Sequence, residues 1–179
     1  MNLPNNPKKT TQAVARLIDA SGGPIDYLRI SKLIYLADRE SIFARGVPIV
    51  GGHYYSMRKG PTIGEVMTFV NTQKAPQWKE TIAPRVGNKV GLRNKPEYSA
   101  LSQSEIDILD SVVKYHSTRS TDQLVEWCHV NCPEFQQVAD GRKPIEVETI
   151  LKSFKKSQKQ IERFVQEAES IARLDSILA

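Results

Sequence analysis

The sequence of 179 residues has few side chains that bind metals, with two cysteines, Cys128 and Cys132, and three histidines, His53, His116 and His129. None of these residues has the spacing of a structural zinc site, and the two thiols suit a reducing compartment. No apolar run approaches the length of about 18 residues that indicates a membrane span, and the first residues lack the apolar region of a secretory signal. We therefore expect a cytoplasmic protein with no metal and no membrane segment.

Motifs for catalysis are missing as well. The chain contains no glycine-rich phosphate loop, no His-Glu-x-x-His pair and no Gly-x-Ser-x-Gly elbow. Pairs of carboxylates do occur, such as Asp107 with Asp110 and Asp38 with Glu40, but we expect them on solvated helix surfaces. The sequence thus predicts no catalytic residues, no cofactor and no enzymatic activity.

The composition that remains is that of a globular domain, with 40% hydrophobic and 25% charged residues and only 10 Gly and 10 Pro. Helical spacing of apolar residues predicts helices from Thr10 or Thr11 to Gly22, from Asp26 to Gly46 and, with capping boxes, over 102–117 and 120–131. The second of these is apolar on most sides, which favours a central position.

Further helices are expected from Gly60-Pro61 to residue 70, over 145–154 and over 161–178. Residues 47–58 read as an extended segment, and Gly87-Asn88 as a hairpin turn between Val86 and Val90. These patterns predict a mainly α (α+β) fold: a compact domain of several helices with a long central helix and a small antiparallel β hairpin.

Charge is distributed unevenly along the chain, whose net charge is +5. Residues 1–55 and 56–99 have net charges of +3 and +5, whereas residues 100–141 have −5. The basic half suits a protein partner or nucleic acid. The helix pair 103–117 and 121–131 has helix-turn-helix lengths, but its acidic side chains have the wrong sign for DNA. A nucleic-acid-binding regulator that uses the basic half therefore stays the alternative function.

One block stands out, Lys32-Leu-Ile-Tyr-Leu-Ala-Asp38 followed by Gly46-Val-Pro48-Ile and then Gly60-Pro61. Lys32, Tyr35 and Arg39 share one polar stripe of the predicted central helix. This order resembles the Panacea domain of the SocA-like antitoxin family. Further segments continue the resemblance over about residues 10–140, although Phe135 stands where tryptophan is expected. These segments are Trp78, Val90-Gly-Leu92, Leu101-Ser102, Leu109, Trp127-Cys-His129 and Pro133-Glu-Phe135.

The resemblance implies a SocA-like antitoxin domain over 1–140, with a helical extension over 141–179 packed on or beside it in one folded unit. It implies an antitoxin that neutralises a cognate toxin by direct protein contact. For members similar to the name-giving protein it also implies an adaptor role, in which the toxin is delivered to an AAA+ protease.

Aromatic and cationic residues around the block form the candidate partner-binding set. The set is Lys32, Tyr35, Arg39, His53, Tyr54, Tyr55, Met57, Arg58 and Lys59. A structural role stays open for Lys32 and for Tyr35, with the tyrosine hydrogen-bonded near the Gly60-Pro61 turn. The other residues of the pattern are expected to be structural, namely Gly46, Pro48, Gly60, Pro61, Trp78, Trp127 and His129.

The last helix has an apolar stripe from Ile161 to Leu178. Such a stripe closes the core, pairs with a second copy in a homodimer, or lies on the toxin, and the sequence leaves these three roles open.

Overall fold

The structure, a computed structural model, describes residues 3–178 and is mainly α with small antiparallel sheets, which confirms the predicted fold class. The helices are α1 (Pro7–Ala20), α2 (Tyr27–Arg45), α3 (Gly64–Thr72), α4 (Pro76–Thr81), α5 (Gln103–Tyr115), α6 (Thr121–Asn131), α7 (Val147–Ser153) and α8 (Gln158–Leu178). The strands are β1 (Ile25–Asp26), β2 (Tyr54–Met57), β3 (Gly60–Ile63), β4 (Lys89–Val90) and β5 (Arg142–Ile145).

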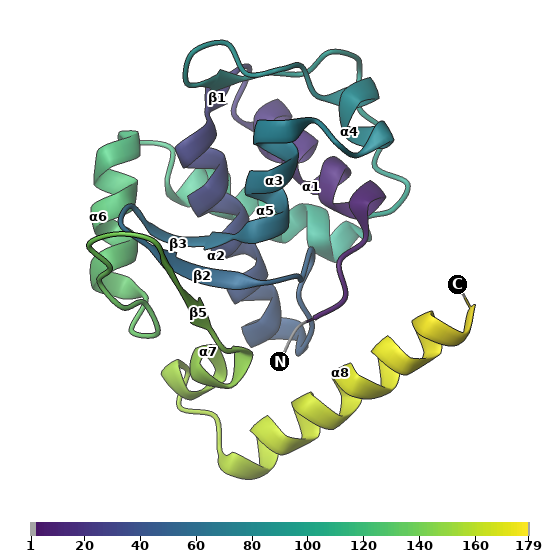
Figure 1. Ribbon diagram of the computed structural model, residues 1–179, viewed down its shortest axis with the longest axis vertical. Helices are drawn as coiled ribbons and strands as arrows, with labels where there is room; N and C mark the ends of the chain where they lie inside the picture. The colour runs from purple at the N-terminus through teal and green to yellow at the C-terminus, as the bar shows by residue number, and fades with distance from the viewer. Residues whose placement is uncertain (1–2, 179) are drawn as a thin grey trace.

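Helix α2 lies at the centre of the molecule, packed between α1, α5, α6 and β3 (Figure 1). It begins where the Asp26 side chain accepts a hydrogen bond from the Leu28 amide at 2.8 Å. It ends at Gly46, whose φ of +75° places the residue in the left-handed region. Its buried residues occupy most of its circumference, as expected for a helix packed on several sides.

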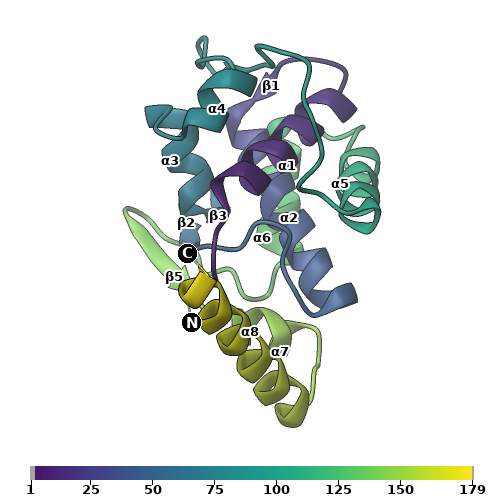
Figure 2. The ribbon, with the colours of Figure 1, turned by 90° about the vertical axis from the view of Figure 1, so that its right-hand side faces the viewer.

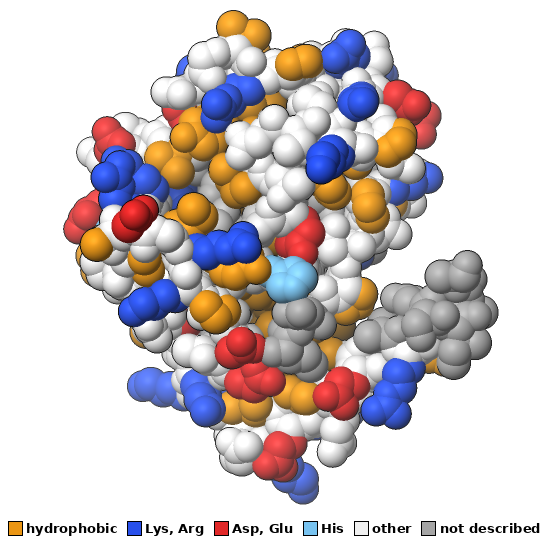
Figure 3. All heavy atoms as spheres, in the orientation of Figure 1, with side chains coloured by type: hydrophobic (Ala, Val, Ile, Leu, Met, Phe, Trp, Pro, Cys, Tyr) orange, Lys and Arg blue, Asp and Glu red, His pale blue; other side chains and the backbone are white. Residues whose placement is uncertain are grey.

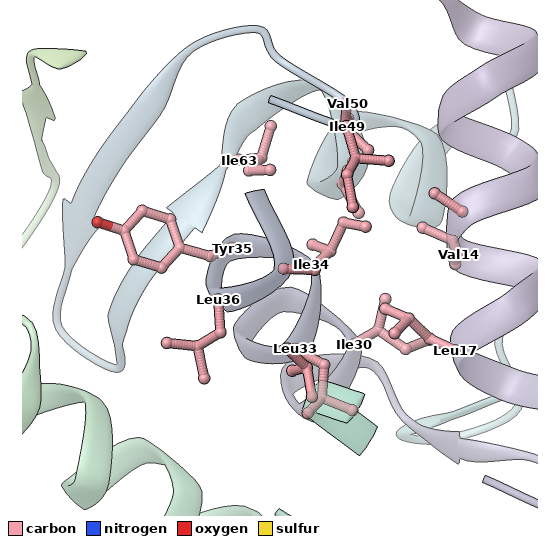
Figure 4. Packing of buried hydrophobic residues seen from close by; sticks show 14 of the residues in the cluster. Val14, Leu17, Ile30, Leu33, Ile34, Tyr35, Leu36, Ile49, Val50 and Ile63 are labelled. Atoms are coloured by element: carbon pink, nitrogen blue, oxygen red, sulfur yellow. The ribbon is translucent and has the colours of Figure 1, made fainter. Parts of the chain in front are cut away.

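The hydrophobic core surrounds this helix (Figure 4). Val14 and Leu17 of α1 pack against one side of α2, and Ile63 of β3 packs near Ile34. Trp78 of α4 is fully buried, with its ring 5.6 Å from that of Phe69. The basic half of the chain therefore supplies much of the apolar interior as well as the charged surface.

Strand β2 is the middle strand of a three-stranded antiparallel sheet, with β3 on one side and β5 on the other. Tyr54 lies opposite Ile63 of β3 and Ile145 of β5. A second, minimal sheet pairs Ile25 of β1 with Val90 of β4. The predicted turn at Gly87-Asn88 is present, but β4 beyond it pairs with β1 as well as folding back toward Val86.

Three predicted helix starts are wrong. Helix α1 begins at Pro7, with Asn6 as its N-cap, and not at Thr10 or Thr11. Gly60 and Pro61 belong to β3, where Pro61 lies opposite Ser56, and the helix begins only at Gly64. A proline is compatible with this strand because β3 is at the edge of its sheet. Ile145 likewise ends β5, and α7 begins two residues later.

The last segment of the chain is built partly into the body. Strand β5 pairs with β2, and α7 packs on α2. Ile161 and Phe164 of α8 are buried, whereas Leu174 is 58% exposed. Helix α8 therefore contacts the body along its first half and extends away from it toward the C-terminus (Figures 1 and 2).

Candidate partner-binding surface

A buried glutamate, Glu134, connects helix α2 to the turn after α6. The Tyr35 hydroxyl donates a hydrogen bond to Glu134 Oε1 at 2.6 Å, and Arg39 Nε donates to the same oxygen at 2.6 Å. Arg39 also lies 4.3 Å from the Phe154 ring and donates to the Ser153 hydroxyl. Burial and the Glu134 charge raise the pKa of Tyr35 well above its ordinary value, so its hydroxyl remains a donor.

Lys32 occupies the other end of this stripe and is 1% exposed. Its ammonium donates to the Pro61 carbonyl oxygen at 2.6 Å and to the Ser31 hydroxyl at 3.3 Å. Both acceptors are neutral oxygens, and burial lowers the pKa of Lys32 to about 8. The side chain thus ties α2 to β3 at the cost of placing a charge in the interior.

Asp38, which we expected on a solvated helix surface with Glu40, is fully buried. Its carboxylate accepts hydrogen bonds from the amides of Ile49, Val50 and Gly51 and from the Tyr54 hydroxyl, all at 2.8–2.9 Å. Burial raises the pKa of Asp38 to about 6, while the four donors favour the ionised form. Asp38 therefore holds the loop after α2 and the start of β2.

The structure separates the predicted binding set into two groups. Lys32, Tyr35 and Tyr54 are buried, and their polar atoms bond within the protein. Arg39 is largely covered, and it faces Glu134 and Phe154. The structural alternative therefore fits Lys32 and Tyr35, although the Tyr35 hydroxyl reaches Glu134 and not the Gly60-Pro61 turn.

The second group is exposed on β2 and on the turn that follows. His53, Met57, Arg58 and Lys59 face solvent, and Tyr55 is half-buried. The alternation of strand side chains explains this division, because Tyr54 and Ser56 point inward on the same strand.

A further cation joins this group from β5. The Arg142 guanidinium lies 4.3 Å from the centre of the Tyr55 ring. The His53 ring stacks on the Tyr55 ring, with an angle of 6° between the ring planes. Glu65 of α3 accepts bonds from the amide and the ring of His53. We call His53, Tyr55, Met57, Arg58, Lys59 and Arg142 the hairpin surface. Basic and hydrophobic side chains lie beside one another on this face (Figure 3).

Three of the residues expected to be structural, Gly60, Pro61 and His129, lie behind this surface. Gly60 has a φ of +96°, and a Cβ there would lie 3.4 Å from the His129 ring. His129 stacks on Phe135 with ring centres 4.6 Å apart, and the Pro61 carbonyl binds Lys32. Trp127 packs its ring 4.7 Å from that of His116, outside the sheet region.

The remaining two members of that set lie in the loop after α2. Gly46 caps the helix, and Pro48 lines a cavity of about 610 Å³ beside α8. Among residues 3–178, no helix is long and apolar enough to cross a membrane. The same residues contain no group of three His, Cys, Asp or Glu side chains placed to hold a metal ion.

Sequence reasoning missed four residues that organise the site: Asp38, Glu65, Glu134 and Arg142. Asp38 had a usable signal, since it is a carboxylate among Ile34, Leu36, Ala37 and Ile42 on a helix that is apolar on most sides. Glu134 and Arg142 had none, because their partners lie more than eighty residues away in the sequence.

The comparison with protein families matches residues 30–134 to the family described as antitoxin SocA-like, Panacea domain. No curated protein and no solved structure matches the chain significantly. The matched residues include most of α2, the β2–β3 hairpin and Glu134, whereas Arg142 of the hairpin surface lies outside them. Since the match covers more than half of the sequence, the chain belongs to the SocA-like, Panacea-domain family of antitoxins.

Proposed function

We propose that this protein neutralises a cognate protein toxin by binding it directly through the hairpin surface. Its family supports an antitoxin role in general. The contact itself is supported by one observation, the exposed group of aromatic, methionine and cationic side chains on a rigid, doubly paired strand. Such side chains are the types enriched at interface centres, and a rigid support reduces the entropy lost on binding.

The rigidity comes from buried polar contacts that serve the hairpin from below. Lys32 holds the start of β3, Asp38 holds the start of β2, and Glu134 with Tyr35 holds the segment that leads to β5. In this proposal the buried part of the predicted binding set positions the surface, and the exposed part contacts the toxin.

Rescue of growth tests the proposal. The reading frame next to this gene is expressed from an inducible promoter, with and without this protein. We expect the frame to be toxic alone and tolerated on co-expression, and the Arg58→Glu variant to rescue less well than the wild type. Lys95→Glu is the matched control, because Lys95 is an exposed lysine of the same basic half away from the hairpin. Equal rescue by both variants would contradict toxin binding through the hairpin surface.

The adaptor role is a second part of the proposal, and it takes place in the cytoplasm, where the two unpaired cysteines would stay reduced. Helix α8 supports it, since Leu174 is 58% exposed on the half of the helix that extends from the body. The test is the toxin half-life in cells with and without each AAA+ protease. A half-life that is independent of the proteases contradicts the adaptor role and leaves direct neutralisation intact.

A further inference from the structure

A hollow of about 720 Å³ opens between the first turns of α2, the β2–β3 turn and the loop that leads into β5. This volume is in the range of small-molecule sites, which are about 300–1,000 Å³. The side chains that carry the argument are Tyr27, Lys32, Met57, Arg58, Lys59 and Arg142. Three segments far apart in the sequence thus form one concave site.

The charge of this hollow is strongly positive. Arg58, Lys59 and Arg142 are exposed around it, and Asp140 is the acidic residue of its lining. The Asp140 carboxylate accepts a hydrogen bond from the Gly141 amide at 2.8 Å. Arg58 and Arg142 both line the hollow. A guanidinium group is suited to phosphate, because it offers paired N–H donors in a fixed plane.

The inner wall adds a buried cation. Lys32 bonds to two neutral oxygens, so its charge is balanced by dipoles and not by a carboxylate in those contacts. A ligand anion in the hollow would bring a negative charge toward this ammonium, which stabilises both groups in a region of low dielectric constant. The hydroxyls of Ser31 and Thr62, which also line the hollow, are 2.8 Å apart and supply further polar contacts.

Part of the lining is apolar. It consists of the Tyr27 ring, Leu28, Met57 and Met67. The Arg85 guanidinium lies 4.5 Å from the centre of the Tyr27 ring and holds it in place. An aromatic ring and methionine side chains accept flat or apolar groups of many shapes.

We propose that this hollow binds a phosphorylated small molecule with a flat or apolar body, of the size of a nucleotide. The phosphates lie against Arg58, Lys59 and Arg142, with Lys32 behind them, and the body lies against Tyr27, Met57 and Met67. Arg142 lies outside the residues that match the family. The family match therefore does not by itself imply this site.

Titration calorimetry with ATP, inorganic pyrophosphate and adenosine tests the proposal on the full chain. We expect ATP to bind at submillimolar concentration, pyrophosphate more weakly, and adenosine more weakly than ATP. The double variant Arg58→Ala with Arg142→Ala should weaken ATP binding about tenfold or more. The double variant Arg93→Ala with Lys95→Ala removes two exposed cations elsewhere in the basic half and should leave the affinity unchanged.

Three results would overturn the site. They are no ATP binding at millimolar concentration, equal weakening by the two double variants, and adenosine that binds as tightly as ATP. All four substituted side chains are exposed, so each variant is expected to fold, which its thermal midpoint verifies. None of these readouts depends on a toxin, and the proposed antitoxin function can fail or hold independently.

Discussion

At the scale of single residues, buried charged side chains hold the loops through hydrogen bonds. Asp38, which binds three backbone amides of the loop after α2, is the clearest case. We expect Asp38→Asn to lower the free energy of unfolding by about 2–4 kcal/mol, because an amide cannot accept all four hydrogen bonds and turns a donor toward backbone amides. Urea denaturation at neutral pH measures the change. Asp107→Asn, at an exposed position of α5, should cost far less, and equal costs would contradict the anchoring role.

The buried ammonium of Lys32 predicts that the free energy of unfolding depends on pH. Its pKa is about 8 in the folded chain and 10.5 ordinarily, so between these values the unfolded chain binds more protons. The unfolding free energy should therefore rise with pH over this window, by about 3 kcal/mol from Lys32 alone. The difference in stability between the wild type and Lys32→Met, measured from pH 7 to pH 10.5, should show this rise. A pH-independent difference would mean that the ammonium is not penalised by burial.

The sequence predicts residue roles only as far as local spacing reaches. It places Lys32, Tyr35 and Arg39 on one stripe correctly, but not what they face. Tyr35 meets Glu134 across 99 positions of the chain, and such a contact is determined by packing and not by spacing.

At the scale of elements, local signals locate most of the helices, although the sequence predicts no helix over Pro76–Thr81. Both capping boxes are present, with Ser102 and Ser120 as N-caps, and the turn at Gly87-Asn88 is where the dipeptide predicts it. Strands β3 and β5 could not be found in this way. Each contains a proline, and β5 is stabilised by pairing with a strand more than eighty residues earlier.

The turn between β2 and β3 gives an element-scale prediction. We expect Gly60→Ala to destabilise the fold by about 1–3 kcal/mol, because alanine is strained at a φ of +96°. Its methyl group would meet the His129 ring at 3.4 Å and Lys32 at 3.6 Å, which are ordinary contacts, so the expected loss comes from the backbone. Gly141→Ala is the control, with a φ of +71° and open space around the added methyl group. Thermal denaturation of both variants should show the larger loss for Gly60→Ala, and the reverse order would contradict backbone strain at this turn.

At the scale of the whole molecule, the family match and the charge distribution act together. The uneven charge, with +5 over residues 56–99 and −5 over residues 100–141, favours electrostatic steering of a protein partner. We expect the association rate with the toxin to fall at least threefold from about 50 mM to about 500 mM salt. Stopped-flow measurements at several salt concentrations test this, and a constant rate would exclude steering.

We expect helix α8 not to be required for toxin binding. Deleting residues 157–179 removes the buried Ile161 and Phe164, so we expect a loss of about 2–5 kcal/mol in stability. The truncated chain should still bind the toxin, because the hairpin surface lies outside the deletion. A folded truncation that cannot bind would transfer the contact to α8, and a dimer that dissociates on truncation would assign α8 to self-association.

The most direct test of the central claim is the dissociation constant of the purified toxin complex for three proteins: the wild type, Tyr55→Ala with Arg58→Glu, and Lys95→Glu. We predict that the Tyr55→Ala/Arg58→Glu variant weakens binding by about a hundredfold or more, since it removes an aromatic side chain and replaces a positive charge by a negative one at the interface. Lys95→Glu should stay within about threefold of the wild type. A folded Tyr55→Ala/Arg58→Glu protein that binds as tightly as the wild type would contradict toxin neutralisation through the hairpin surface.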